Sequence, residues 1–125
     1  MDNSENGRFF REAWIAGVKH HYPGTPKDGY IAPWEAIAQW EKESASAVYE
    51  QVRQFVALSD GKTTCLSREQ KGRFVCLCWI VQVFRHISNP KSSYIADWDE
   101  IPGWQKETDA DIFEAIEREV LQEVA

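Results

Sequence analysis

The sequence predicts an all-α domain made from two copies of one αα-hairpin. Residues 7–56 of the 125-residue chain align with residues 72–120 after the deletion of a single residue in the loop after His86. Apolar residues recur at helical spacing in both copies, and no stretch alternates between apolar and polar residues as a strand would. All the tryptophans of the chain also fall into matching pairs, which chance explains poorly. The pairs are Trp14 with Trp79, Trp34 with Trp98, and Trp40 with Trp104.

The first copy predicts two helices joined by an irregular connection. Residues 7–21 carry apolar side chains on one helical face, and the sequence Tyr22–Pro26 ends this helix because proline has no amide donor and clashes inside a helix. Pro33 then opens a second helical stretch, since its fixed φ suits a first turn. Residues 44–56 continue it with an apolar stripe.

The second copy repeats this plan with clearer capping signals. Ser67 followed by Gln70 forms a capping-box pattern, which predicts a helix over residues 67–87. Asp97 is a further N-terminal signal, ahead of a short helical piece at residues 98–101. The last helix is predicted over residues 104–123, and acidic residues crowd its start, where the helix dipole favours them.

Neither copy is expected to bury its apolar faces alone. We therefore expect a single domain over residues 1–125, with repeat one at 7–56, a linker at 57–66 and repeat two at 67–123. The two hairpins should pack about a pseudo-twofold axis as a four-helix domain with short extra helical turns. Residues 74–84 are apolar nearly all round, so we expect that helix to be the most buried, and its counterpart at 9–19 to be an outer one.

Composition and charge exclude several classes of protein. The net charge of −6 makes nucleic acid an unlikely partner, because nonspecific binding to a phosphate backbone needs a basic surface. No run of 18 apolar residues exists, so we expect no membrane-spanning helix. The N-terminus is polar and acidic rather than signal-like, so we expect a cytoplasmic protein.

The charges are distributed unevenly along the chain. Residues 62–91 hold six basic and one acidic residue, and residues 97–125 hold ten acidic and two basic residues. One interpretation is that the two segments pack together and neutralise each other. The other is that the acidic segment binds a basic partner or imitates DNA. The residues of the last helix that would bind such a partner are Glu107, Asp111, Glu114 and Glu117.

No catalytic motif is present, and we expect neither enzymatic activity nor a cofactor. Gly61-Lys62-Thr63 matches only the tail of a phosphate-binding loop and is interpreted as a polar turn. No metal site is predicted, because Cys76 and Cys78 point apart on a helix and are interpreted as small buried apolar residues. The histidines at the helix ends, His21 and His86, are interpreted as favourable partners of the helix dipole.

The paired tryptophans allow two interpretations: a duplicated core, or an aromatic cleft that stacks a planar ligand. Under the second interpretation the ligand would be anionic and would lie at the two helix–helix connections, where lysine and tyrosine stand close together in the sequence. The candidate ligand-binding residues are Lys27, Tyr30, Trp34, Lys91, Ser92, Tyr94 and Trp98.

Two segments, residues 33–44 and 97–108, share the pattern Trp-x5-Trp-x-Lys-Glu-Ser/Thr. This element resembles small helical modules of bacteria and phages, some of which carry a ryanodine-receptor-type (RyR) repeat. The resemblance implies a compact, pseudo-symmetric helical domain and, by analogy with some bacterial members, a sensor of nucleotide-derived ligands. The sequence departs from the RyR pattern at residues 21–24 and 32–34, which stand where a Gly-Trp-x-Tyr-Gly segment and a His-Pro are typical.

The sequence therefore predicts a non-enzymatic binding or adaptor module. The first hypothesis is a sensor of a small anionic or nucleotide-derived ligand at the two connections. The alternative is a phage- or bacteria-encoded inhibitor or interaction protein that uses the acidic last helix. Apolar surface left over on the first helix of either copy is where a homodimer contact is expected.

Overall fold

A computed structural model describes residues 3–123, and all regular structure in this part of the chain is helical. The four α-helices are α1 (Asn3–His21), α2 (Gln39–Leu58), α3 (Arg68–His86) and α4 (Gly103–Glu123). Short 3-10 helices fill the connections between them: η1 (Asp28–Tyr30), η2 (Trp34–Ala36), η3 (Lys62–Cys65), η4 (Ser92–Ile95) and η5 (Trp98–Glu100).

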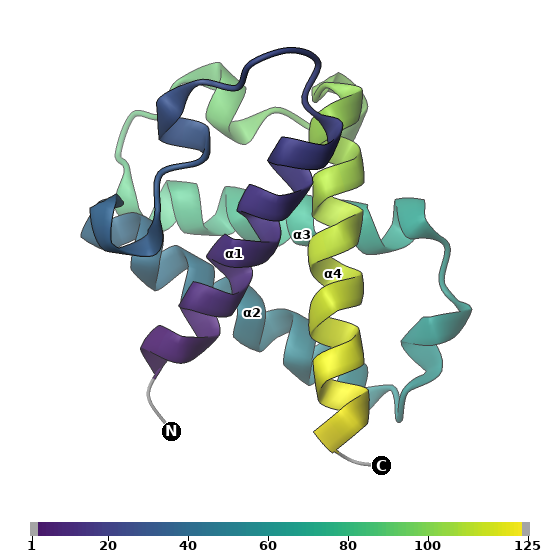
Figure 1. Ribbon diagram of the computed structural model, residues 1–125. Coiled ribbons are helices and arrows are strands. Elements are labelled where there is room, and N and C mark those ends of the chain that lie inside the picture. Colours follow the sequence, from purple (N-terminus) through teal and green to yellow (C-terminus); the bar gives the residue numbers. More distant parts are fainter. Residues whose placement is uncertain (1–2, 124–125) are drawn as a thin grey trace.

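The helices pack as the predicted pair of hairpins. α1 packs on α2, and α3 packs on α4. α1 also lies alongside α4, so the two hairpins are joined into one four-helix domain (Figure 1). The all-α fold class predicted from the sequence is confirmed.

Local signals explain where the elements of the second copy begin. Ser67 caps α3 with a complete capping box, in which its side chain accepts from the Gln70 amide and the Gln70 side chain accepts from the Ser67 amide. Asp97 caps η5 in the same way with Glu100. Between the copies, α2 ends in a turn in which Asp60 and Gly61 both have positive φ, a conformation that glycine adopts at little cost.

The core is centred on α2 and α4 rather than on α3. The side chains with no exposed surface include Val48 and Val52 on α2, and Ile112 and Phe113 on α4. The prediction that residues 74–84 form the most buried helix is wrong. α3 buries one face, but Leu77, Val81 and Phe84 on its other face are more than half exposed.

The first tryptophan of each pattern packs on a glycine of the preceding helix. Trp34 lies against Gly7, and Trp98 lies against Gly72, so closely that a Cβ atom on either glycine would overlap the indole ring. Both indoles are almost fully buried. Packing therefore requires glycine at these two positions, because a side chain there would occupy the space of the indole ring.

Cations cover each of these indole rings in the same way in the two copies. The guanidinium of Arg8 and the ammonium of Lys42 lie 5.9 and 5.7 Å from the Trp34 centroid. The matching residues Arg73 and Lys106 lie 5.9 and 5.8 Å from the Trp98 centroid. The spacing from tryptophan to lysine in the repeated pattern thus sets a cation over an aromatic ring.

The remaining tryptophans join one copy to the other. Trp14 of copy one contacts Trp104 of copy two at 5.8 Å between ring centroids, and Trp79 of copy two contacts Trp40 of copy one at 6.0 Å. These two contacts are related by the repeat, as a pseudo-twofold axis requires. They hold the two hairpins together.

Candidate functional site

The predicted site at the first connection is occupied by contacts within the chain. The Arg11 side chain donates to the carbonyl oxygens of Ala32 and Gly29, which fixes this connection against α1. The Tyr30 ring packs against Trp104, and its carbonyl accepts from the Trp14 indole. Burial lowers the pKa of Arg11, and the opposing effect of Glu41 is smaller.

The second connection is held less firmly. Cys76 stands where copy one has Arg11, and its thiol makes one long contact of 3.8 Å with the Ala96 carbonyl. Lys91, Ser92 and Tyr94 are exposed, with Tyr94 at 45%. The richer hydroxyl content of this loop therefore faces solvent rather than a pocket.

The seven candidate ligand-binding residues do not converge on one cavity. Lys27 lies over the ring of Tyr30, and Trp98 is buried against Gly72. Of the seven, only Trp34 lines either of the two surface grooves described below. The prediction that these residues form a ligand site is untested, but the geometry favours the interpretation of the tryptophans as core.

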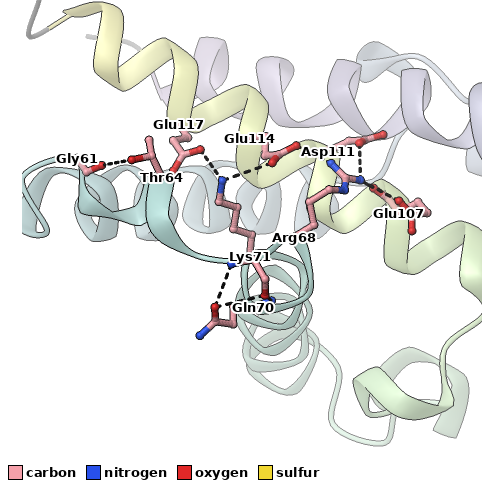
Figure 2. A network of polar contacts seen from close by, with 10 residues as sticks. Gly61, Thr64, Arg68, Gln70, Lys71, Glu107, Asp111, Glu114 and Glu117 are labelled. Atoms are coloured by element: carbon pink, nitrogen blue, oxygen red, sulfur yellow. Dashed lines mark hydrogen bonds and ion pairs between the residues drawn. The ribbon is translucent and has the colours of Figure 1, made fainter.

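The four candidate partner-binding acids lie opposite cations of α3 (Figure 2). Arg68 donates to Glu107 at 3.0 Å and to Asp111 at 2.9 Å, and it also bonds to Glu114. Burial acts to lower the pKa of Arg68, but these hydrogen bonds outweigh it and raise the pKa. The basic and acidic segments of the sequence thus pack together and neutralise each other.

The most buried part of this network is the ion pair between Lys71 and Glu117. The Lys71 ammonium lies 2.9 Å from one Glu117 oxygen, and both side chains are 6% exposed. Figure 2 shows Lys71 reaching from α3 to Glu114 and Glu117 of α4. A buried pair of this kind costs desolvation free energy. The second Glu117 oxygen is also buried and has no hydrogen-bond partner among the described residues.

The α1/α4 seam, the contact between these two helices, is closely packed. Gly17 lies directly against Thr108, and Gly17 and Ala115 line a groove of about 360 Å³. His21 Nε2 lies 2.8 Å from an Asp111 oxygen, which completes the polar contacts at this end of α1.

The α2/α3 seam is the repeat-related contact, and its side chains are different. Gln82 and Gln51 stand where the α1/α4 seam has Gly17 and Ala115. Ala47 stands where that seam has Asp111, so His86 has no carboxylate corresponding to the partner of His21. α2 and α3 also pack less extensively than α1 and α4, as expected when longer side chains separate two helices.

Four buried polar atoms of the α2/α3 seam have no hydrogen-bond partner within residues 3–123. They are Ser44 Oγ, Gln51 Oε1, Gln82 Oε1 and His86 Nε2. Ser44 is fully buried and Gln82 is 5% exposed. Buried polar atoms normally bond to something, and an unpaired one typically costs about 1–3 kcal/mol, so these four atoms require an explanation.

Beside the α2/α3 seam lies a groove of about 660 Å³ that is open to solvent. Its lining includes the indole of Trp34, the cations Lys42 and Arg85, and the acids Glu43 and Glu50. Arg85 forms no ion pair with any residue that the structure describes. Neither the groove nor the unpaired atoms were predicted from the sequence, although the repeat alignment already shows Ala47 and Gln82 in place of Asp111 and Gly17.

The remaining reactive side chains that the structure describes include two buried cysteines. Burial raises the pKa of Cys76 and of Cys78 to about 11, so both thiols stay protonated at neutral pH. Within residues 3–123 no cluster of His, Cys, Asp or Glu is placed to hold a metal ion. Over the same residues, none of the helices combines the length and hydropathy needed to cross a bilayer.

Comparison with protein-family models, with curated proteins and with solved structures finds no match to this chain. The resemblance to RyR-type modules therefore stays a prediction. Any functional proposal depends on the geometry alone.

Proposed function

We propose that the protein is a non-enzymatic binding module that holds a small polar ligand at the α2/α3 seam. The observation that carries this proposal is that four buried polar atoms on the two helices of this seam are unpaired: Ser44 Oγ, Gln51 Oε1, Gln82 Oε1 and His86 Nε2. The two glutamine oxygens can only accept hydrogen bonds, whereas the Ser44 hydroxyl and the His86 imidazole can donate or accept, so a ligand that pairs with them must offer hydrogen-bond donors. None of these four residues lines the adjoining groove, so a ligand entering from the groove would have to displace side chains of the seam to reach them.

The charges of the groove limit the class of ligand. Lys42 and Arg85 are balanced by Glu43 and Glu50, so the rim carries no excess charge. A polyphosphate would meet repulsion from the two acids as well as attraction from the two cations. A small zwitterion, such as a free amino acid, satisfies both signs and fits the proposal better than the nucleotide-derived ligand considered from the sequence.

The proposal can be tested by thermal unfolding with free amino acids and, separately, with nucleoside mono- and triphosphates. A ligand present at a hundredfold excess over its Kd stabilises the folded state by about 2.7 kcal/mol and raises the Tm by several degrees. We expect a shift with one class of zwitterion and none with triphosphates. In NMR spectra the side-chain amide signals of Gln51 and Gln82 should move in the same titration.

Two variants test whether the Tm shift arises from binding at the α2/α3 seam. Ala47→Asp gives His86 a carboxylate at the position where Asp111 pairs with His21, and it should abolish the Tm shift. We expect α2 to tolerate this aspartate because α4 holds Asp111 at the same position. Arg118→Gln removes an exposed cation of the other groove and should leave the shift unchanged. A response to triphosphates alone, or a response that survives Ala47→Asp, would contradict a zwitterion site in the α2/α3 seam.

A further inference from the structure

The arginine that fixes the first connection is replaced by a cysteine at the second. In copy one, the Arg11 guanidinium donates to the carbonyl oxygens of Ala32 and Gly29. In copy two, Cys76 takes the place of Arg11, and its thiol faces the matching carbonyl of Ala96 at 3.8 Å. A thiol is a single weak donor, whereas a guanidinium has five donors in a rigid fork. The thiol is therefore a poor substitute for the donor that Ala32 receives.

A buried acid nevertheless faces this place from α4. Asp109 is 6% exposed, and its carboxyl group forms no hydrogen bond or ion pair with any residue that the structure describes. Burial is the main cause of the raised pKa of Cys76 and the charge of Asp109 is the next, which places this carboxyl group near the thiol. In copy one the acid that acts on Arg11 is Glu41, which stands one turn earlier in the repeat. Copy two thus has an acid here without the arginine.

The other charged groups that act on Cys76 are engaged elsewhere. Asp97 accepts from a backbone amide as the cap of η5. Arg73 bonds to two exposed acids, and its guanidinium covers the ring of Trp98. Neither group pairs with Asp109 in the described part of the chain. A buried carboxyl group without a partner costs stability, and a cation from outside the chain would recover that loss.

The second connection is also packed less closely than the first. Tyr30 packs on Trp104, and its carbonyl oxygen accepts from the Trp14 indole. Its counterpart Tyr94 is 45% exposed, and among the described residues its carbonyl oxygen receives no matching bond from the Trp79 indole. A connection held by few contacts can admit a ligand at little cost in packing.

We infer that the second connection binds a guanidinium group from outside the chain, between the Asp109 carboxylate and the Ala96 carbonyl oxygen. The group takes the place that the Arg11 guanidinium has in copy one. A planar guanidinium suits this guanidinium site better than an ammonium ion, because its fork of donors can serve a carbonyl and a carboxylate at once. The group belongs either to a small guanidinium compound or to an arginine side chain of a partner protein. The site shares no residue with the α2/α3 seam.

An NMR titration of the labelled chain with methylguanidinium chloride tests the site. We expect the amide signals of Cys76, Ala96 and Asp109 to move and to saturate at millimolar concentrations, far below the molar range in which guanidinium salts unfold proteins. Methylammonium chloride should bind at least tenfold more weakly. Equal binding of the two cations, or the absence of a saturable response to methylguanidinium, would overturn the inference.

Two variants remove the site in different ways. Asp109→Asn removes the carboxylate and should weaken methylguanidinium binding at least tenfold. Cys76→Arg supplies a guanidinium within the chain, as Arg11 does in copy one, and should abolish binding. Asp28→Asn removes an exposed acid of the first connection and is the matched control, which should bind as the wild type does. Circular dichroism establishes which variants are folded, and a folded Asp109→Asn that binds methylguanidinium like the wild type would be decisive against the site.

A blocked peptide, acetyl-Gly-Gly-Arg-Gly-Gly-amide, identifies the source of the group. Binding at least as tight as that of methylguanidinium assigns the site to an arginine side chain of a protein, and much weaker binding assigns it to a small compound. Ala47→Asp, which should abolish the ligand response of the α2/α3 seam, should leave methylguanidinium binding unchanged. The two sites can therefore be confirmed or rejected separately. Loss of methylguanidinium binding in Ala47→Asp would place this cation in the seam and contradict the guanidinium site.

Discussion

At the scale of single residues, one difference between the two copies is a buried carboxyl group. Asp109 is 6% exposed and occupies the position that Ala45 holds in copy one. Burial raises its pKa well above the ordinary value of an aspartate. A carboxyl group held in this way makes stability depend on pH.

Replacing Asp109 by asparagine should stabilise the protein at neutral pH. In the unfolded chain the carboxyl group loses its proton near its ordinary pKa of about 3.9. Above that pH the folded state binds more protons than the unfolded state, so the stability of the wild type falls as pH rises. Asp109→Asn should remove this dependence and gain about 1 kcal/mol or more near pH 7, with no gain below about pH 4.

Urea denaturation of both proteins at acidic and neutral pH measures this difference. Asp99→Asn is the control, because its exposed ion pair with Arg73 contributes little to stability. If the difference in free energy of unfolding between Asp109→Asn and the wild type is the same at both pH values, the buried carboxyl group keeps an ordinary pKa.

At the scale of the elements, helix packing depends on two glycines that accept tryptophan rings. Gly72→Ala should destabilise the protein by about 2 kcal/mol or more, because overlap with the Trp98 ring outweighs the roughly 1 kcal/mol that alanine gains in helix propensity. Gly103→Ala should be neutral or stabilising, since nothing lies near the added methyl group. Chemical denaturation compares the two, and equal stability would contradict the tight packing of Trp98 on α3.

Sequence reasoning predicted most of the elements but not which helix is central. The capping residues Ser67 and Asp97 and the repeat alignment gave the helix starts within a few residues. The burial of α3 was overestimated because apolar residues occur all round this helix. Composition does not distinguish an apolar face that is buried from one that is left exposed. Leu77 and Phe84 look the same in sequence as the buried Val75 and Val83.

The candidate site was harder to predict, for a physical reason. Lys27 and Tyr30 lie three positions apart in the sequence, but contacts with Arg11 and Trp104 pack this connection against the rest of the protein. The α2/α3 seam depends on residues far apart in the chain, such as Ser44 and His86. Its unpaired atoms are evident only from the three-dimensional structure.

At the scale of the whole molecule, each hairpin depends on the other. The cross-copy contacts of Trp14 with Trp104 and of Trp40 with Trp79 join them, together with the shared core of α2 and α4. Neither half alone can cover these apolar surfaces.

Two separate peptides, residues 1–60 and 61–125, should therefore lack a cooperative fold when studied individually. Mixed in equal amounts, they should regain the helical circular dichroism of the intact chain, with a midpoint that depends on concentration. A peptide that unfolds cooperatively by itself would contradict this dependence. The cut at the turn of Asp60 and Gly61 breaks no helix, so loss of the fold would reflect the separation of the hairpins.

The turn at Asp60 and Gly61 also acts as a tether. It keeps the two hairpins at an effective local concentration in the millimolar range, as short linkers do. Assembly of the four helices is then a first-order process that dilution does not reverse. Because the two hairpins are linked, neither has to pair with an identical copy, and each can change its residues independently. The tether therefore permits the α1/α4 seam to stay closely packed while the α2/α3 seam carries unpaired polar groups.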